Sequence, residues 1–184
     1  YNLDQTLLTP FEEQTSSDYT LKQAIDNVQL IFAIRNINLD VEKTKLAALL
    51  HDISGIMTSQ EMYDFAISRG FEIDPAEEKY HALLHQRVSK TVAQEEYGIT
   101  DSDILNAIEC HTTLRRDASL YDKVIFISDK ISWDQKGVPS YDDLLKAIIK
   151  SPLETPELSL FFKSSLSTTY PDTPKNSKGL SNYL

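Results

Sequence analysis

Three of the four histidines in this sequence interrupt apolar runs that have helical spacing. They are His51 in LLHD, His85 in LLHQ and His111 in IECHTT, and Asp129 has a similar setting in IFISDKI. A carboxylate beside buried apolar side chains costs free energy unless it is paired or bound to a metal. Imidazole nitrogen and carboxylate oxygen together suit zinc, iron, manganese or cobalt. These positions therefore predict a transition-metal site.

Each of these positions also has an ordinary interpretation. A histidine at a helix end often serves as a cap or as a hydrogen-bonded core group. Asp52, which follows His51, could accept a hydrogen bond at the same helix end. His81 and His85 are four residues apart and share a helix face, but His81 follows the charged sequence EEK and is predicted to be solvated.

An all-α framework is predicted to position these residues, because apolar residues recur every three or four positions. Helix-start signals support it, among them the capping box TSQE at 58–61 and the Asp74-Pro75 pair. The run KVIFIS at 123–128 has the composition of a strand, but we favour a helix because the sequence offers no partner strand. Further helices are expected over about 19–32, 40–50, 58–70, 74–98, 101–111 and 140–149.

Three segments are predicted along the chain. Residues 1–18 are a polar N-terminal extension, 19–150 form the main domain, and 151–184 hold a short helix and a loose tail. A chain of 184 residues is long enough for one substantial domain. In the last segment, the apolar side chains of LSLFF (158–162) either cover the domain or contact a second subunit, so a homodimer remains an open expectation.

The charge and cysteine content narrow the function classes. With 18 basic and 28 acidic residues the net charge is −10, which disfavours a nucleic-acid-binding surface. Apolar runs are too short for a membrane span. The single cysteine, Cys110, excludes an internal disulfide, and we expect a cytoplasmic protein. A small phosphorylated ligand fits this composition, because a metal ion could supply local positive charge.

Four motifs in order resemble those of a known family. LLHDISG, LLHQRVS, AIECHTT and IFISDKI are similar in sequence and order to motifs of the HD-domain superfamily, and in particular of the bacterial YqeK-type hydrolases. Those enzymes split dinucleoside tetraphosphates symmetrically. The resemblance covers roughly residues 19–150. It implies a helical bundle around a two-metal site, usually with iron, while manganese, cobalt and zinc also suit the ligands.

The resemblance also implies residue roles. Asp52 would bridge the two metals, and together with His51 it would form the catalytic His-Asp pair. One metal would be completed by His85 and His111, and the other by His51 and Asp129. The metals would activate a water molecule to attack phosphorus in a small nucleotide.

Three cations near these ligand positions are candidates for phosphate contacts. They are Arg115, Arg116 and Lys130. For each of them, a solvated surface charge is an equally good interpretation.

The sequence departs from the family at one ligand. The family carries a further histidine on the first core helix, and the corresponding position here is Lys22; residues 1–50 contain no histidine. An ammonium group repels a metal cation unless it is deprotonated. Two outcomes follow. Either the site with Asp52, His85 and His111 still binds metal and hydrolyses a nucleotide, or the domain binds a nucleotide or a partner without catalysis.

Overall fold

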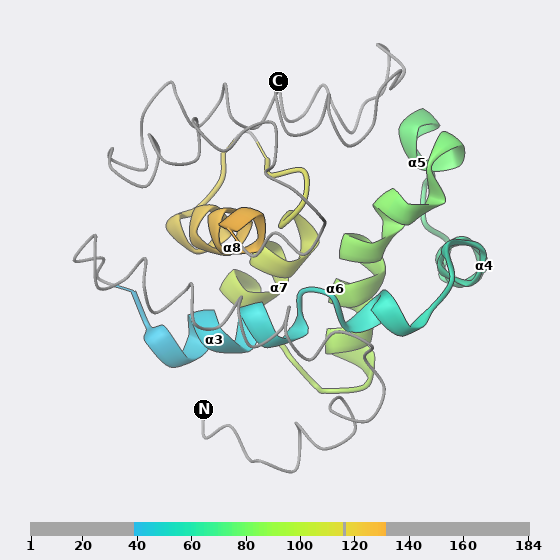
Figure 1. The fold of residues 1–184 in the computed structure, drawn as a ribbon. Coiled ribbons are helices and arrows are strands. Elements are labelled where there is room, and N and C mark those ends of the chain that lie inside the picture. Colours follow the sequence, from blue (N-terminus) through green and yellow to red (C-terminus); the bar gives the residue numbers. More distant parts are fainter. Residues whose placement is uncertain (1–38, 116, 132–184) are drawn as a thin grey trace.

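The computed structural model describes residues 39–115 and 117–131 of the chain (Figure 1). Several expectations lie outside these residues: the helices over 19–32 and 140–149, both terminal segments, and the side chains of Lys22 and Arg116. All regular elements of the described residues are helices, which agrees with the all-α prediction. They are α3 (Val41–Leu50), η2 (Ile53–Ile56), α4 (Ser59–Ser68), α5 (Pro75–Lys79), η3 (His81–Leu84), α6 (His85–Glu95), α7 (Ser102–Glu109) and α8 (Leu120–Ile131).

Helix α3 begins where the sequence predicts. Asp40 has an extended backbone, and its side chain accepts a hydrogen bond from the Lys43 amide at 3.0 Å. This bond satisfies one of the amides that lack an intrahelical partner in the first turn. The second half of the helix, from Leu46 to Leu50, is buried against α6, α7 and α8. The apolar end of α3 therefore carries the His-Asp pair into the interior.

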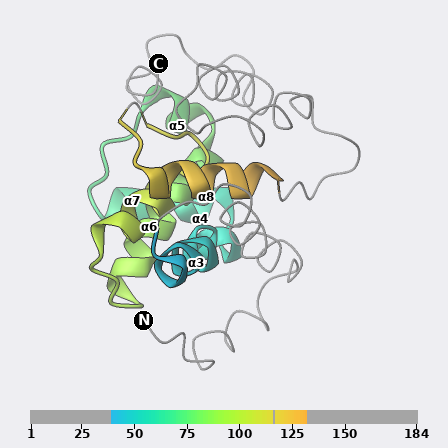
Figure 2. The same ribbon diagram turned by 90° about the vertical axis from the view of Figure 1, so that its left-hand side faces the viewer.

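Helix α7 lies between α6 and α8 and contacts both, as two perpendicular views show (Figures 1 and 2). In α8, the four consecutive side chains from Val124 to Ile127 are all buried. A helix can bury four successive residues only where neighbours cover it on several sides. This enclosure explains the strand-like composition of 123–128 and confirms the helical prediction.

Helix α4 is fixed at both ends. The Thr58 amide donates to Glu61 Oε2 at 2.7 Å and the Glu61 amide donates to Thr58 Oγ1 at 3.3 Å, so the predicted capping box is formed. Gly70 ends the segment with a φ of 72°, which favours glycine. Between these ends, Met62 and Ala66 pack against α6 in an apolar cluster.

The expected single helix over 74–98 is wrong, since the structure divides it into α5, η3 and α6. The backbone leaves the helical conformation at Tyr80, with φ −130° and ψ 82°. Across this break, Arg87 Nη1 donates to both carboxylate oxygens of Glu77, at 2.9 and 2.7 Å, and to the Glu72 carbonyl. A straight helix would place residues ten positions apart about 15 Å from each other. The tertiary ion pair is therefore compatible only with the bent chain.

His81 lies in this bent region and differs from its prediction. The side chain is half-buried, and its ring stacks on Tyr63 at a centroid distance of 4.1 Å. It is therefore only partly exposed to solvent. Among the described residues, no helix is long and apolar enough to cross a membrane.

Candidate metal centre

Three histidines lie at the ends of three helical segments and make the same backbone contact. His51 follows α3, His85 follows η3, and His111 lies one residue beyond the C-cap of α7. In each ring Nδ1 contacts the carbonyl three residues earlier, at 2.6 Å for His51, 2.6 Å for His85 and 2.8 Å for His111. A carbonyl only accepts, so Nδ1 donates. Each neutral ring therefore presents the lone pair of Nε2.

These Nε2 atoms converge with Asp52. His85 Nε2 lies 2.9 Å from His111 Nε2, and Asp52 Oδ1 is 3.6 Å from the first and 3.2 Å from the second. The side chains come from α6, from the turn after α7 and from the end of α3. The predicted ligands for one metal are thus brought together.

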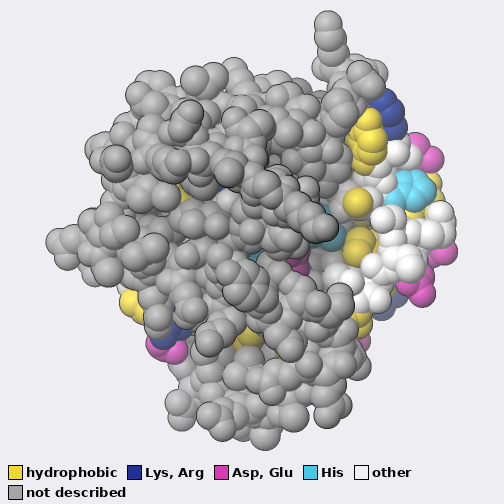
Figure 3. Space-filling model, viewed as in Figure 1, with side chains coloured by type: hydrophobic (Ala, Val, Ile, Leu, Met, Phe, Trp, Pro, Cys, Tyr) yellow, Lys and Arg dark blue, Asp and Glu magenta, His cyan; other side chains and the backbone are white. Residues whose placement is uncertain are grey.

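The second carboxylate oxygen of Asp52 faces the remaining predicted ligands. His51 Nε2 is 3.3 Å from Asp52 Oδ2 and 3.7 Å from Asp129 Oδ1. His51 is 1% exposed, and its Nε2 has no hydrogen-bond partner in the described part of the chain. Asp52 itself exposes 44% of its side-chain surface, so the cluster is not sealed from solvent. Figure 3 shows that some histidine side chains of the described residues (cyan) reach the molecular surface near hydrophobic ones (yellow).

The charges of the cluster suit a cation. Partial burial opposes ionisation of Asp52 and fuller burial opposes that of Asp129, but the histidines lower the pKa of Asp52, and Lys130 and His51 lower the pKa of Asp129. Burial and the neighbouring His111 lower the pKa of His85 to about 4, so this ring is neutral at pH 7. For His51, burial lowers the pKa, but the charges of Asp52 and Asp129 raise it above the ordinary value. The result is two anionic carboxylates beside a neutral His85 ring and a His51 ring whose proton a bound cation would have to displace.

A metal ion fits this donor set. His85 and His111 direct two nitrogen lone pairs at each other, which is unfavourable unless a cation or proton lies between them. Two ligands at right angles, each about 2.1 Å from a metal, are about 3.0 Å apart, close to the observed 2.9 Å. His51, Asp52 and His111 also offer ligand atoms that lie within 4.8 Å of one another. Nitrogen and carboxylate donors suit zinc, iron, manganese or cobalt equally well.

The candidate phosphate ligands are differently placed. Arg115 donates from Nε and Nη2 to Oδ2 of the buried Asp122, at 2.9 and 2.6 Å, so its guanidinium is held beside the start of α8. Lys130 donates to Asp129 Oδ2 and its Nζ lies over the Phe126 ring, at the edge of the cluster. Of the two, only Lys130 contacts a predicted metal ligand.

Sequence reasoning missed two polar residues that follow the histidines. Thr112 Oγ1 lies 2.9 Å from His85 Nε2, and Gln86 hydrogen bonds to the turn that carries His111. Their position in the sequence could have revealed them, because Gln86 directly follows His85 and Thr112 directly follows His111. Ser54 and Ser89 were missed as well: their hydroxyls are 2.9 Å apart and join η2 to α6.

Comparisons with known proteins identify the family of this chain. The model of the HD domain family matches residues 21–134. The chain is 35% identical over 155 residues to an uncharacterized protein in the pepC 5'region of Lactococcus lactis subsp. cremoris. The aligned region covers 74% of this chain and 80% of that protein. It is 30% identical over 182 residues to the symmetrical bis(5'-nucleosyl)-tetraphosphatase of Bacillus subtilis, with 94% of each chain covered.

A solved structure shares the fold. It is the crystal structure of a "predicted HD superfamily hydrolase involved in NAD metabolism" from Clostridium acetobutylicum, with a TM-score of 0.79, 23% identity, and 98% of this chain and 94% of that chain covered. The helical fold, the matching family model and the relatives at this identity lead to one conclusion. The chain belongs to the HD-domain family of hydrolases and is similar to the YqeK-type symmetrical tetraphosphatases.

Proposed function

We propose that this protein is a metal-dependent phosphohydrolase that splits a dinucleoside tetraphosphate symmetrically. Water would add to a phosphorus atom of the central phosphoanhydride, the bridging P–O bond would break, and two nucleoside diphosphates would leave. The convergence of Asp52 with the Nε2 atoms of His85 and His111 carries the proposal. Similarity to the Bacillus subtilis tetraphosphatase supports the substrate class. Because such nucleotides are intracellular, a cytoplasmic location is part of the proposal.

In this proposal, His85, His111 and Asp52 Oδ1 hold one metal ion. His51, Asp52 Oδ2 and Asp129 form a second, less complete set, since Lys22 stands where the family has a histidine. A bound transition metal supplies a Lewis acid that lowers the pKa of water and neutralises phosphate charge. Iron is the metal that we favour, and manganese, cobalt and zinc are the alternatives.

The protein side chains have separate tasks in this reaction. The Nδ1 hydrogen bonds hold each imidazole with its Nε2 lone pair toward the cluster. Asp52 offers one oxygen to each side, so its charge is shared between the two halves of the site. Lys130, which donates to Asp129, would contact a phosphate oxygen. Arg115 is engaged with Asp122 and would need to leave that carboxylate before it could do the same.

The first test is elemental analysis of protein purified without chelators, followed by assays with added iron, manganese or cobalt. We expect transition metal near one equivalent per chain, and conversion of a dinucleoside tetraphosphate into two diphosphates. His85→Ala should reduce both metal content and turnover. Turnover should fall by more than about 100-fold, since even a change to a residue that only orients a metal ligand costs about 10–100-fold.

His81→Ala is the matched control. His81 lies four residues before His85 but stacks on Tyr63, outside the metal cluster. This variant should keep its metal and its turnover. Wild-type protein that binds no transition metal and turns over no dinucleoside polyphosphate would defeat the proposal.

A second candidate is a domain that binds a nucleotide without hydrolysing it. Two observations favour it: Lys22 at a ligand position, and an Arg115 that is already paired with Asp122. In that case wild-type protein would bind a dinucleoside tetraphosphate and release no diphosphate. Lys22→His should then increase metal binding. Hydrolysis by wild type that His85→Ala removes would exclude this candidate.

A further inference from the structure

Gln86 directly follows His85 in α6 and reaches the turn that follows α7. We propose that Gln86 is a positioning residue that fixes His111 and Thr112 relative to His85 and thereby sets the metal affinity of the centre. This inference rests on the proposed function, because it concerns how the same site binds metal. It assigns a role to a side chain that contacts neither metal nor substrate in that proposal.

The carboxamide of Gln86 makes a set of buried contacts to consecutive residues of the turn. Its Oε1 accepts hydrogen bonds from the amides of Thr112 and Thr113, both at 3.3 Å. Its Nε2 donates to Thr113 Oγ1 at 2.9 Å. Gln86 is 4% exposed and Thr113 is 6% exposed. At such burial, water cannot readily replace a lost hydrogen bond, so the contacts constrain the turn.

The turn has a backbone that requires such a constraint. Helix α7 ends at Glu109, and the Leu114 amide donates to the Cys110 carbonyl at 2.7 Å. This closure places Leu114 at a φ of 51°, a left-handed conformation that is sterically unfavourable for leucine. A strained conformation persists only where the surrounding structure holds it. Gln86 contacts the two residues that immediately precede Leu114.

Adjacent residues of α6 therefore hold adjacent residues of the turn. His85 Nε2 lies 2.9 Å from both His111 Nε2 and Thr112 Oγ1, while Gln86 binds the amides that follow His111. Metal–ligand distances are constrained to about ±0.2 Å. A small displacement of the turn would therefore move His111 out of ligand range. Gln86 prevents this displacement.

Gln86→Met tests the proposal, because methionine keeps the length of the side chain and removes its hydrogen bonds. Co²⁺ is the probe, since its visible absorption reports ligand geometry. We expect the Kd for Co²⁺, measured by titration calorimetry, to rise about 10–100-fold, as for other changes to residues that orient a metal ligand. The visible spectrum should change shape. In metal-free protein, the amides of Thr112 and Thr113 should exchange hydrogen faster than in wild type.

Three variants act as controls. Val88→Ala lies in the same helix, is buried and packs in the cluster with Met62 and Ala66, so it should lower stability and leave the Co²⁺ Kd and spectrum unchanged. Thr113→Val removes only the hydroxyl contact and should weaken Co²⁺ binding less than Gln86→Met does. Thr113→Ser retains the hydroxyl and should bind Co²⁺ as tightly as wild type. If Gln86→Met fails to fold, the Val and Ser variants of Thr113 decide.

The outcomes separate this proposal from the previous one. Wild-type protein that binds no Co²⁺ contradicts the proposed metal-dependent function itself. Wild-type binding that Gln86→Met leaves unchanged in Kd and spectrum overturns the positioning role. Equal exchange rates of the two threonine amides in wild type and Gln86→Met overturn it as well. Weaker Co²⁺ binding with an altered spectrum in Gln86→Met, but not in Val88→Ala, supports it.

Discussion

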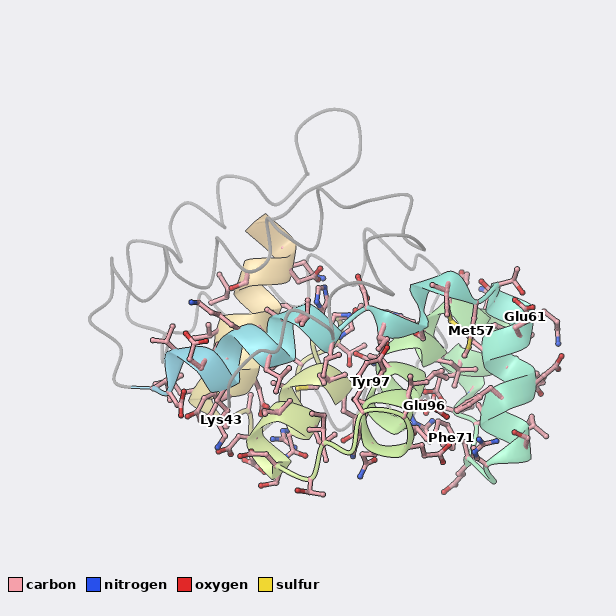
Figure 4. The ribbon with its side chains drawn as sticks, turned by 90° about the horizontal axis from the view of Figure 1, so that it is seen from below. Lys43, Met57, Glu61, Phe71, Glu96 and Tyr97 are labelled. Carbon is pink, nitrogen blue, oxygen red and sulfur yellow. The ribbon has the colours of Figure 1, made fainter. Side chains whose placement is uncertain are left out.

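Helix α6 contributes to two buried regions of very different chemistry. On one side, Val88 joins Met62, Ala66 and Leu84 in an apolar cluster, with partly buried neighbours that include Met57 and Phe71. At its N-terminal end, His85 joins two more imidazoles and a carboxylate. Figure 4 shows Met57 and Phe71 near α4, at the opposite end of the described region from Lys43.

The two regions differ in whether their buried polar atoms have partners within the protein. The apolar cluster needs only close packing, and the capping box at Thr58 and Glu61 closes the helix that covers it. In the histidine cluster, one buried nitrogen of His51 lacks a partner among the described residues, and two lone pairs face each other. Such an arrangement is costly in a folded protein unless a ligand repays the cost. The first region provides stability and the second provides a binding site.

The largest expected effect is a loss of stability when the apolar cluster is truncated while the histidine cluster is left intact. Met62→Ala should lower the free energy of unfolding by about 3 kcal/mol, because truncating a buried methionine costs 2–5 kcal/mol. Chemical denaturation of metal-free protein measures this loss. The affinity for Co²⁺ should be unaffected. A large loss of Co²⁺ affinity in Met62→Ala would mean that the two regions are not independent.

Metal bound to the histidine cluster should stabilise the folded protein. At a free Co²⁺ concentration 100 times Kd, the free energy of unfolding should rise by about 2.7 kcal/mol. Denaturation with Co²⁺ and with a chelator measures the difference. In His111→Ala this increase should disappear, since one nitrogen ligand is absent. An equal increase in both proteins would place the bound metal elsewhere.

A smaller effect is expected at the cap of α4. Thr58→Ala should lower the free energy of unfolding by about 1 kcal/mol, because the Glu61 amide loses its acceptor. Thr58→Ser retains the hydroxyl and is the matched variant. Neither change should alter metal binding. Equal stability of the Ala and Ser variants would mean that the cap contributes little.

The smallest expected effect is a loss of stability at acid pH, when Asp101 becomes protonated. Lys43 Nζ lies 2.9 Å from Asp101 and 2.6 Å from Asp103, which joins α3 to the start of α7. Burial raises the pKa of Asp101, but hydrogen bonds from Lys43 and two backbone amides lower it below its ordinary value. A lowered folded-state pKa stabilises the protein above the unfolded-state pKa, and this stability is lost as pH falls through the folded-state pKa.

The contribution should be at most about 1 kcal/mol, because the pair is partly exposed to solvent. Denaturation of wild type and Asp101→Asn at neutral and acid pH measures it. The variant should be less stable than wild type near pH 7, and the gap should shrink in acid. A gap that stays constant with pH would show that the ionic charge of Asp101 does not contribute to stability, since asparagine keeps the Oδ1 acceptor of the cap.

Local signals account for the parts of the fold that sequence reasoning predicted. Thr58 and Asp74 cap their helices as predicted, and Asp40 and Asp101 cap helices whose starts were predicted near them, because a cap depends on residues only two or three positions away. His51, His85 and His111 could be singled out because each interrupts an apolar run, and the family resemblance supplied the expectation that they meet.

What could not be predicted depends on contacts between distant residues. The break at Tyr80 goes together with the pairing of Arg87 with Glu77, a contact that a periodic pattern does not reveal. Gln86 meets Thr113 across 27 positions of sequence, so neither residue appears important on its own. Arg115 was predicted from its charge alone, and its pairing with Asp122 emerges only once α8 is in place.

The shared Nδ1 contact has a consequence for how tightly the centre can bind. Each ring is already held by a carbonyl of its own helical segment before any ion arrives. Little rotamer freedom is then left to lose on coordination, so binding is spared much of the entropic cost that flexible ligands incur. The helix ends thus preorganise the imidazole rings, and the metal affinity depends on the backbone carbonyls as well as on the rings.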